Sequence, residues 1–113
     1  MVRKKYVPKR GDIVWITFSP THGHEQGGRR PALVLSREEY NKLISLAIVV
    51  PITSKSKGYS FEVPIKFGSL QGVVLSDHIR SIAYKERNVG FIGTVSESLI
   101  QEVQSKFLSI LEG

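Results

Sequence analysis

A β-strand is predicted for the run Ile13-Val14-Trp15-Ile16-Thr17-Phe18, because β-branched and aromatic residues favour the pleated, half-buried surface of a sheet. Alternate residues of a strand share a face, which groups Val14 with Ile16 and Phe18, and Ile13 with Trp15 and Thr17. Since both groups include large apolar residues, we expect both faces of this strand to be at least partly covered.

A polar, glycine-rich segment follows, and it reads Thr21-His22-Gly23-His24-Glu25-Gln26-Gly27-Gly28-Arg29-Arg30-Pro31. Loops that carry such residues on a rigid scaffold are frequent sites of binding and catalysis. A solvated hairpin loop is the alternative interpretation. Because Arg30 abuts Pro31 and the next apolar run, we expect its guanidinium to be better anchored than that of Arg29.

The rest of the chain predicts a mainly β domain with two helices. Short apolar runs between turn residues predict strands at 32–35, 46–52, 61–65, 73–75, 79–83 and 89–93. Pro51 predicts that its strand ends at an edge or a bulge. Ser36 and Glu39 form a capping box for a short internal helix. Apolar residues at helical spacing from Leu99 onward predict a C-terminal helix, with Thr94 or Ser96 as its N-cap.

The composition indicates one globular domain, residues 1–113, built on a small curled or closed antiparallel sheet. The absence of cysteine excludes disulfides and a cysteine nucleophile. No run approaches the ~20 apolar residues of a membrane span. The basic N-terminus also lacks the apolar segment of a signal peptide. We therefore expect a cytoplasmic protein that does not enter a membrane.

The chain is basic, with a net charge of +6 and a pI near 9.8. Five basic residues fall within the first ten positions. This balance favours a polyanionic partner, either nucleic acid or an acidic protein, through Coulomb attraction and counterion release. A solvated basic arm that aids solubility is the alternative.

Candidate metal ligands are sparse, because His22 and His24 or Asp77 and His78 form only pairs, whereas zinc sites use three or four ligands. The sequence contains no HExxH, GxxxxGK[ST], GxGxxG or GxSxG motif. We therefore expect no metal and no cofactor.

Metal-free cleavage of RNA is a chemistry that the remaining polar residues fit, because RNA carries its own nucleophile, the 2′-OH. Arg30 presents a planar fork that matches phosphate oxygens, and the hydroxyl of Thr53 is a second donor. Glu25 is a candidate general base, although His24 and His22 have pKa values better suited to proton transfer.

A second polar loop, residues 53–60, interleaves lysines with an aromatic residue. Lys55 and Lys57 can hold phosphates while Tyr59 stacks on an unpaired base. A basic turn with a buried tyrosine explains the same residues equally well.

Several different short motifs are distributed along nearly the whole chain: Tyr6-Val7-Pro8, Gly11-Asp12-Ile13-Val14-Trp15, Gly23-His24-Glu25-Gln26, Arg30-Pro31-Ala32-Leu33-Val34-Leu35-Ser36, Val50-Pro51-Ile52-Thr53, Ser56-Lys57-Gly58-Tyr59, Gly72-Val73-Val74-Leu75-Ser76-Asp77 and Gly93-Thr94-Val95. In order and spacing they resemble the MazF/PemK toxins of bacterial toxin–antitoxin systems. Each motif alone is weakly specific, but their shared order over the chain is a strong signal.

The resemblance implies an SH3-like β-barrel of the CcdB/MazF type, a homodimer and a sequence-specific endoribonuclease. Such toxins cut single-stranded mRNA without a metal, leave 2′,3′-cyclic phosphate and 5′-OH ends, and so inhibit translation and growth. Their activity is neutralised by an antitoxin whose acidic, disordered tail lies in the RNA groove. The charge of +6 fits both partners.

The resemblance also implies roles for individual residues. Arg30 and Thr53 match the key arginine and threonine of the family, and Glu25 lies in the loop that gates the groove. Lys57, Tyr59 and Asp77 match positions near the RNA. One departure is His78, where many relatives have glutamine, and His24 and Arg29 occupy positions that vary.

Two other functions remain open. One is a gyrase-poisoning toxin of the CcdB kind, which is not an enzyme and relies on a C-terminal Trp-Gly-Ile. This sequence reads Leu111-Glu112-Gly113 there, and its only tryptophan is Trp15, which counts against that function. The other is a non-catalytic RNA-binding barrel, which needs the basic groove but not Arg30 and Thr53 as a catalytic pair.

Overall fold

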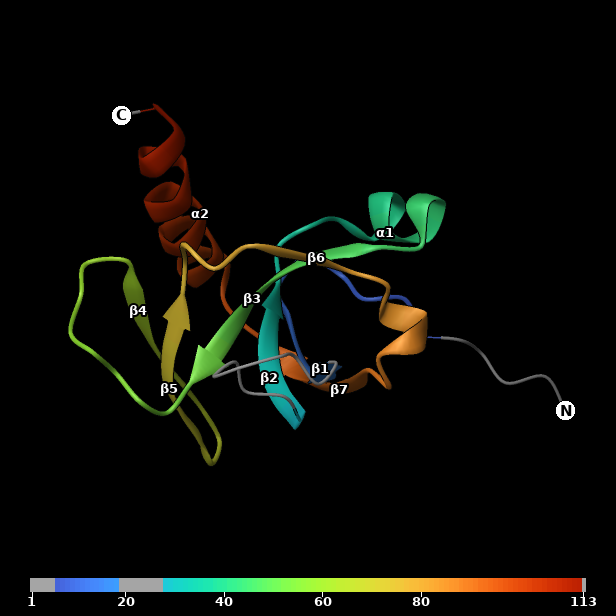
Figure 1. Ribbon diagram of the computed structural model, residues 1–113, viewed down its shortest axis with the longest axis horizontal. Coiled ribbons are helices and arrows are strands. Elements are labelled where there is room, and N and C mark those ends of the chain that lie inside the picture. The colour runs from blue at the N-terminus through green and yellow to red at the C-terminus, as the bar shows by residue number, and fades with distance from the viewer. Residues whose placement is uncertain (1–5, 19–27, 113) are drawn as a thin grey trace, which may run out of the picture.

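The computed structural model describes residues 6–18 and 28–112. These residues form a curled antiparallel sheet with two α-helices and one short 3₁₀ helix (Figure 1). The strands are β1 (Asp12–Phe18), β2 (Gly28–Val34), β3 (Ala47–Thr53), β4 (Glu62–Phe67), β5 (Leu70–Leu75), β6 (Arg80–Ile82) and β7 (Gly90–Thr94). The helices are α1 (Glu38–Ile44), α2 (Glu97–Glu112) and the short 3₁₀ helix η1 (Tyr84–Glu86). The predicted class, mainly β with an internal and a C-terminal helix, is confirmed.

The sheet runs in the order β4-β5-β3-β2-β1-β7, and β6 pairs with part of β3. Its curl separates two clusters of buried apolar residues. One cluster joins β1, β2, β3, β6 and η1, and it includes Val14, Ile16 and Phe18. The other joins β1 to β5 and α2, and it includes Ile13 and Val103.

Both faces of the first strand are at least partly covered, as its sequence predicts. Val14, Ile16 and Phe18 are buried as expected, and so is Ile13 on the opposite face. Trp15, however, is 39% exposed, and Thr17 is only half-buried. The second face of β1 is therefore covered at its start, beneath the cluster that includes α2, and open toward its end.

Pro51 lies in a central strand, and the predicted edge is wrong. One side of β3 pairs with β2. On its other side, residues 47–49 pair with β6 and residues 52–53 pair with β5. The N–H that proline lacks therefore falls where β3 changes its partner strand, so a proline is tolerated inside the sheet.

The N-caps of the two long helices differ from one another. Ser36 does not cap α1, whose N-cap is Arg37 without a side-chain hydrogen bond. The Ser36 hydroxyl instead donates to Asn41 Oδ1 and accepts the N–H of Ile48 at 2.8 Å, so it joins α1 to β3. The predicted capping box is wrong because a tertiary hydrogen bond takes this hydroxyl.

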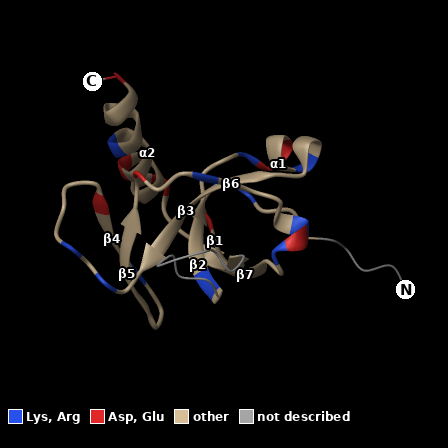
Figure 2. Cartoon of the chain, in the orientation of Figure 1, with Lys and Arg blue, Asp and Glu red and all other residues tan. Residues whose placement is uncertain are grey.

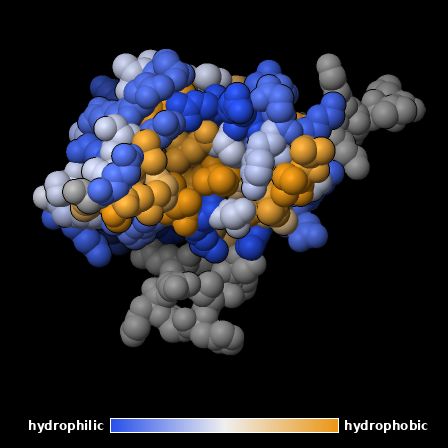
Figure 3. Space-filling model, turned by 90° about the horizontal axis from the view of Figure 1, so that it is seen from above, coloured by the Kyte–Doolittle hydropathy of each residue, from blue (hydrophilic) through white to orange (hydrophobic). Residues whose placement is uncertain are grey.

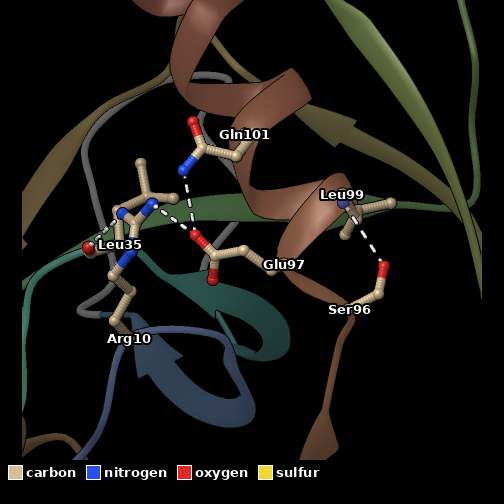
Figure 4. Close-up of polar contacts among 6 residues, drawn as sticks. All are labelled: Arg10, Leu35, Ser96, Glu97, Leu99 and Gln101. Atoms are coloured by element: carbon tan, nitrogen blue, oxygen red, sulfur yellow. Dashed lines mark hydrogen bonds and ion pairs between the residues drawn. The ribbon is translucent and has the colours of Figure 1, made fainter.

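Helix α2 is fixed at its N-terminus by polar contacts (Figure 4). Ser96 is the cap, since its Oγ accepts the N–H of Leu99 at 3.3 Å. Arg10 donates to the carbonyl of Leu35 at 3.1 Å and forms an ion pair with Glu97 at 3.5 Å. These contacts hold the first turn of α2 against the segment before β1, while its buried face packs on the sheet.

Candidate functional site

The two arginines Arg29 and Arg30 lie within strand β2, not in the loop that the sequence predicts. Arg30 pairs with Ile16 of β1, and directly opposed residues point to the same side of a sheet. Because Ile16 is part of the cluster with Phe18, Arg30 projects from that face as well. The side chain of Arg30 is therefore positioned by strand pairing and is only partly exposed.

Thr53 reaches the same face from the neighbouring strand. Ala32 of β2 pairs with Pro51 of β3, and continuing this register by two residues sets Arg30 opposite Thr53. The Thr53 hydroxyl oxygen accepts the N–H of Lys55 at 3.1 Å, which leaves its own proton available for donation. The fold thus brings together two residues that lie far apart in the sequence.

Arg29 points to the opposite face, and it is the better anchored of the pair. Its guanidinium donates to the carbonyl of Asn88 and to Thr17 Oγ1 at 3.4 Å. Within residues 6–18 and 28–112, Arg30 forms no ion pair. The prediction that Arg30 is held while Arg29 is free is wrong, because β2 extends far enough to bring Arg29 beside the segment that precedes β7.

The second predicted loop is folded around one carboxylate, that of Glu62. It accepts hydrogen bonds from Ser56 Oγ at 2.6 Å, Lys57 N at 2.8 Å and Gly58 N at 3.0 Å. These bonds lower the pKa of Glu62 below its ordinary value, the bond from Ser56 having the largest effect. Glu62 is not among the site residues predicted from the sequence, because its place in an alternating strand explains it. A carboxylate shortly after a basic glycine turn is nevertheless a usable signal.

Tyr59, Asp77 and His78 form a cluster beside this loop. The Tyr59 hydroxyl donates to Asp77 Oδ1 at 2.9 Å and lies 3.4 Å from His78 Nε2. The Oδ1 atom of Asp77 and the Nε2 atom of His78 are 3.8 Å apart. Partial burial and the hydrogen bond to Asp77 raise the pKa of Tyr59 to about 12, so the phenol remains a donor at neutral pH.

Positive charge borders this region (Figure 2). Lys and Arg residues occur along the loop between β3 and β4 and at the start of β2. Lys55 and Lys57 are exposed, and neither ammonium forms an ion pair within the part of the chain that the structure describes. An anion approaching Arg30 and Thr53 therefore meets exposed cations, although the Glu62 carboxylate interacts with the charge of Lys57.

Three residues of the predicted site, His22, His24 and Glu25, lie outside the described residues. Among the residues that are described, no group of three or more His, Cys, Asp or Glu side chains is arranged to hold a metal ion. The same residues include no helix long and apolar enough to cross a membrane.

Comparison with known proteins identifies the family. Residues 9–111 match the sequence model of a family described as "PemK-like, MazF-like toxin of type II toxin-antitoxin system". The chain belongs to the PemK/MazF toxin family. The predicted membership is thereby confirmed, and the match covers every described strand and helix except the last residue of α2.

Relatives of this PemK/MazF-family chain match over almost its full length. It is 42% identical to the endoribonuclease toxin MazF of Escherichia coli strain K12, over 96% of this chain and 97% of that protein. A crystal structure of MazF from Deinococcus radiodurans superposes with a TM-score of 0.88 at 44% identity, covering 96% of this chain and 100% of that one. A MazE–MazF crystal structure from the same organism gives 0.86 at 44% identity, covering 96% and 98%.

Proposed function

We propose that this protein is the endoribonuclease toxin of a type II toxin–antitoxin system. Relatives named as endoribonucleases match it from end to end, and its family is one of toxins. The observation that carries the proposal is the placement of Arg30 and Thr53 on one face of adjacent strands, close in the chain to the exposed Lys55 and Lys57. This arrangement suits a phosphodiester better than a small neutral substrate.

The proposed reaction is metal-independent cleavage of single-stranded RNA. A general base removes the 2′-OH proton, the 2′-oxygen attacks phosphorus, and the bond from phosphorus to the 5′-oxygen breaks. That oxygen takes up a proton, so the products are a 2′,3′-cyclic phosphate and a 5′-OH. Arg30 and Thr53 donate to the phosphoryl oxygens as charge develops there. Glu25 and His24 are the candidate bases.

The loop between β3 and β4 is proposed to bind the RNA strand. Lys55 and Lys57 contact phosphates, and the ring of Tyr59 stacks on a base. Asp77 and His78 hold the Tyr59 hydroxyl and are positioned to contact base edges. Arg29, tied to Asn88 on the other face, contributes positive charge rather than direct contact.

The proposed protein partners are an antitoxin with an acidic, disordered tail and a second copy of this chain. A MazE–MazF structure matches closely, and the charge of +6 suits an acidic tail. Large apolar side chains are exposed on both helices, and the face in Figure 3 shows an apolar hollow with a hydrophilic border. Such surface is typical of protein interfaces. Sedimentation of the protein as a monomer at micromolar concentration would contradict the homodimer. The proposed location of the protein is the cytoplasm.

The test is cleavage of a long, mostly unstructured RNA by purified protein in excess EDTA, with sequencing and end-group analysis of the products. We expect discrete cuts that carry 2′,3′-cyclic phosphates. Arg30→Ala should lower kcat by about 10²–10³-fold, as for the loss of an oxyanion donor.

The matched control is Arg37→Ala, which removes an exposed guanidinium beyond the other end of β2. Cleavage only with added metal would contradict the mechanism. If Arg30→Ala weakened binding but left kcat unchanged, Arg30 would bind RNA and have no catalytic role.

A further inference from the structure

One more arginine, Arg80 at the start of β6, lies over a buried aromatic ring. Its guanidinium carbon is 4.8 Å from the centroid of Phe18, which is 4% exposed. A cation over the face of a ring is attracted by the ring quadrupole, and this attraction uses none of the N–H donors of the guanidinium. Phe18 therefore fixes Arg80 without satisfying its hydrogen bonds.

Arg80 lies on the same face of the sheet as Arg30 and Thr53. It pairs with Val49 of β3, and Val49 is a member of the cluster that contains Phe18. Within β3, Val49 and Thr53 lie four positions apart, an even number, and so point to the same side of the sheet. Arg30 opposes Ile16, which lies two positions before Phe18 in β1, so Arg30 projects from the same face as the Phe18 ring.

Arg80 is exposed, and none of the residues that the structure describes neutralises its charge. Within the described ranges, Arg80 forms no ion pair and no side-chain hydrogen bond, and its only side-chain partner there is the Phe18 ring. The nearest carboxylate in the sequence, Asp77, accepts a hydrogen bond from Tyr59 and lies 3.8 Å from His78. None of the five N–H donors of Arg80 is therefore used by a described residue, and they can bind an external anion.

We propose that Arg80 is an RNA-binding residue that holds a backbone phosphate next to the one at Arg30, with Phe18 as its positioning residue. This inference rests on the proposed function. Arg80 belongs to β6 and Arg30 to β2, so the two guanidiniums project from different strands of the same face. A nucleic-acid strand offers a phosphate to each of them, whereas a mononucleotide offers phosphates at one site only.

The experiment measures steady-state cleavage and, separately, equilibrium binding of a non-cleavable oligonucleotide with 2′-deoxy substitution at the cut site. Arg80→Ala should raise both KM and Kd about tenfold, as for the loss of a charge-assisted hydrogen bond, while kcat stays within about twofold. The slope of log Kd against log salt concentration should also decrease by the amount expected for the loss of about one phosphate contact. Arg80→Lys should restore part of the affinity and the salt dependence.

Two further variants distinguish the effect of the Phe18 ring from the effect of losing a positive charge. Phe18→Leu keeps an apolar side chain in the core but removes the ring, and should raise KM by a smaller factor than Arg80→Ala. Arg37→Ala, the matched loss of one exposed positive charge at α1, should leave KM near the wild-type value. Thermal unfolding of each variant identifies any loss that is due to misfolding.

The outcomes distinguish this inference from the proposed function. If the wild type cleaves RNA and Arg80→Ala matches Arg37→Ala in KM, Kd and salt dependence, the role of Arg80 is overturned while the nuclease stands. A loss confined to kcat would also overturn a binding role. If the wild type neither cleaves nor binds RNA, both proposals fail.

Discussion

The carboxylate of Glu62 in β4 accepts the backbone N–H of Lys57 at 2.8 Å, across a loop that has no regular secondary structure. The same carboxylate also accepts donors from Ser56 and Gly58. From the far side, Lys106 of α2 donates to the carbonyl of Ser60 at 2.6 Å. The proposed RNA-binding loop is therefore ordered by an internal anion and by a contact with the C-terminal helix.

The first prediction concerns the contribution of Glu62 to the stability of the protein in acid. Because hydrogen bonds lower the pKa of Glu62 in the folded protein, its stabilising effect is present above its ordinary pKa of 4.5 and is lost as pH falls through the lower folded value. Glu62→Gln should therefore be less stable than the wild type near neutral pH and equally stable in stronger acid. Thermal unfolding of both proteins across this range is the measurement, and a difference that did not depend on pH would contradict it.

The second prediction concerns the Thr53 hydroxyl. Thr53→Val keeps the shape of the side chain and its preference for strands but removes the donor, so kcat should fall by about 10²-fold. Thr53→Ser restores the hydroxyl and should recover most of the activity, both for donation to phosphate and for accepting the N–H of Lys55. Single-turnover cleavage compares the three proteins. Full activity in Thr53→Val would remove Thr53 from the mechanism.

The third prediction concerns Tyr59, whose pKa is raised to about 12 by burial first and by Asp77 second. A raised folded pKa means that the stabilisation from the neutral phenol is complete below pH 10, its ordinary value, and is lost as pH rises toward 12. Asp77→Asn should lower the pKa of Tyr59 without returning it to 10, because burial remains.

Tyrosinate absorbance measures this titration, and subtracting the trace of Tyr59→Phe isolates the signal of Tyr59. Circular dichroism on the same samples shows whether the protein is still folded. An unchanged titration in Asp77→Asn would mean that the hydrogen bond to Asp77 has no part in the shift.

The fourth prediction concerns packing between β7 and β4. Gly93 is buried, and a Cβ there would overlap the ring of Phe67. Gly93→Ala should lower the free energy of unfolding by about 1–3 kcal/mol, the usual cost of overpacking. Phe67→Leu should relieve the overlap, so the double variant should be more stable than the sum of the two single changes predicts. Denaturant unfolding of all four proteins completes the cycle.

Local patterns in the sequence were sufficient for much of the fold. The β-branched and aromatic run of β1, the apolar run of β3 and the helical spacing in α2 depend on residues close together in the chain. The order of short motifs also identified the family. A local pattern singled out Tyr59, and the family resemblance singled out Asp77 and His78, but neither predicted the hydrogen bonds among them.

Contacts between distant segments determined the rest. Arg30 and Thr53 share a face because β2 and β3 pair in one register, and a shift of one residue would turn either side chain away. Arg29 is anchored by Asn88, Ser36 by Asn41 and Ile48, and Arg80 by Phe18, each through a partner that no local spacing specifies. A residue's own sequence neighbourhood sets its strand or helix preference, whereas the partner of a polar side chain depends on which strands the folded sheet brings together.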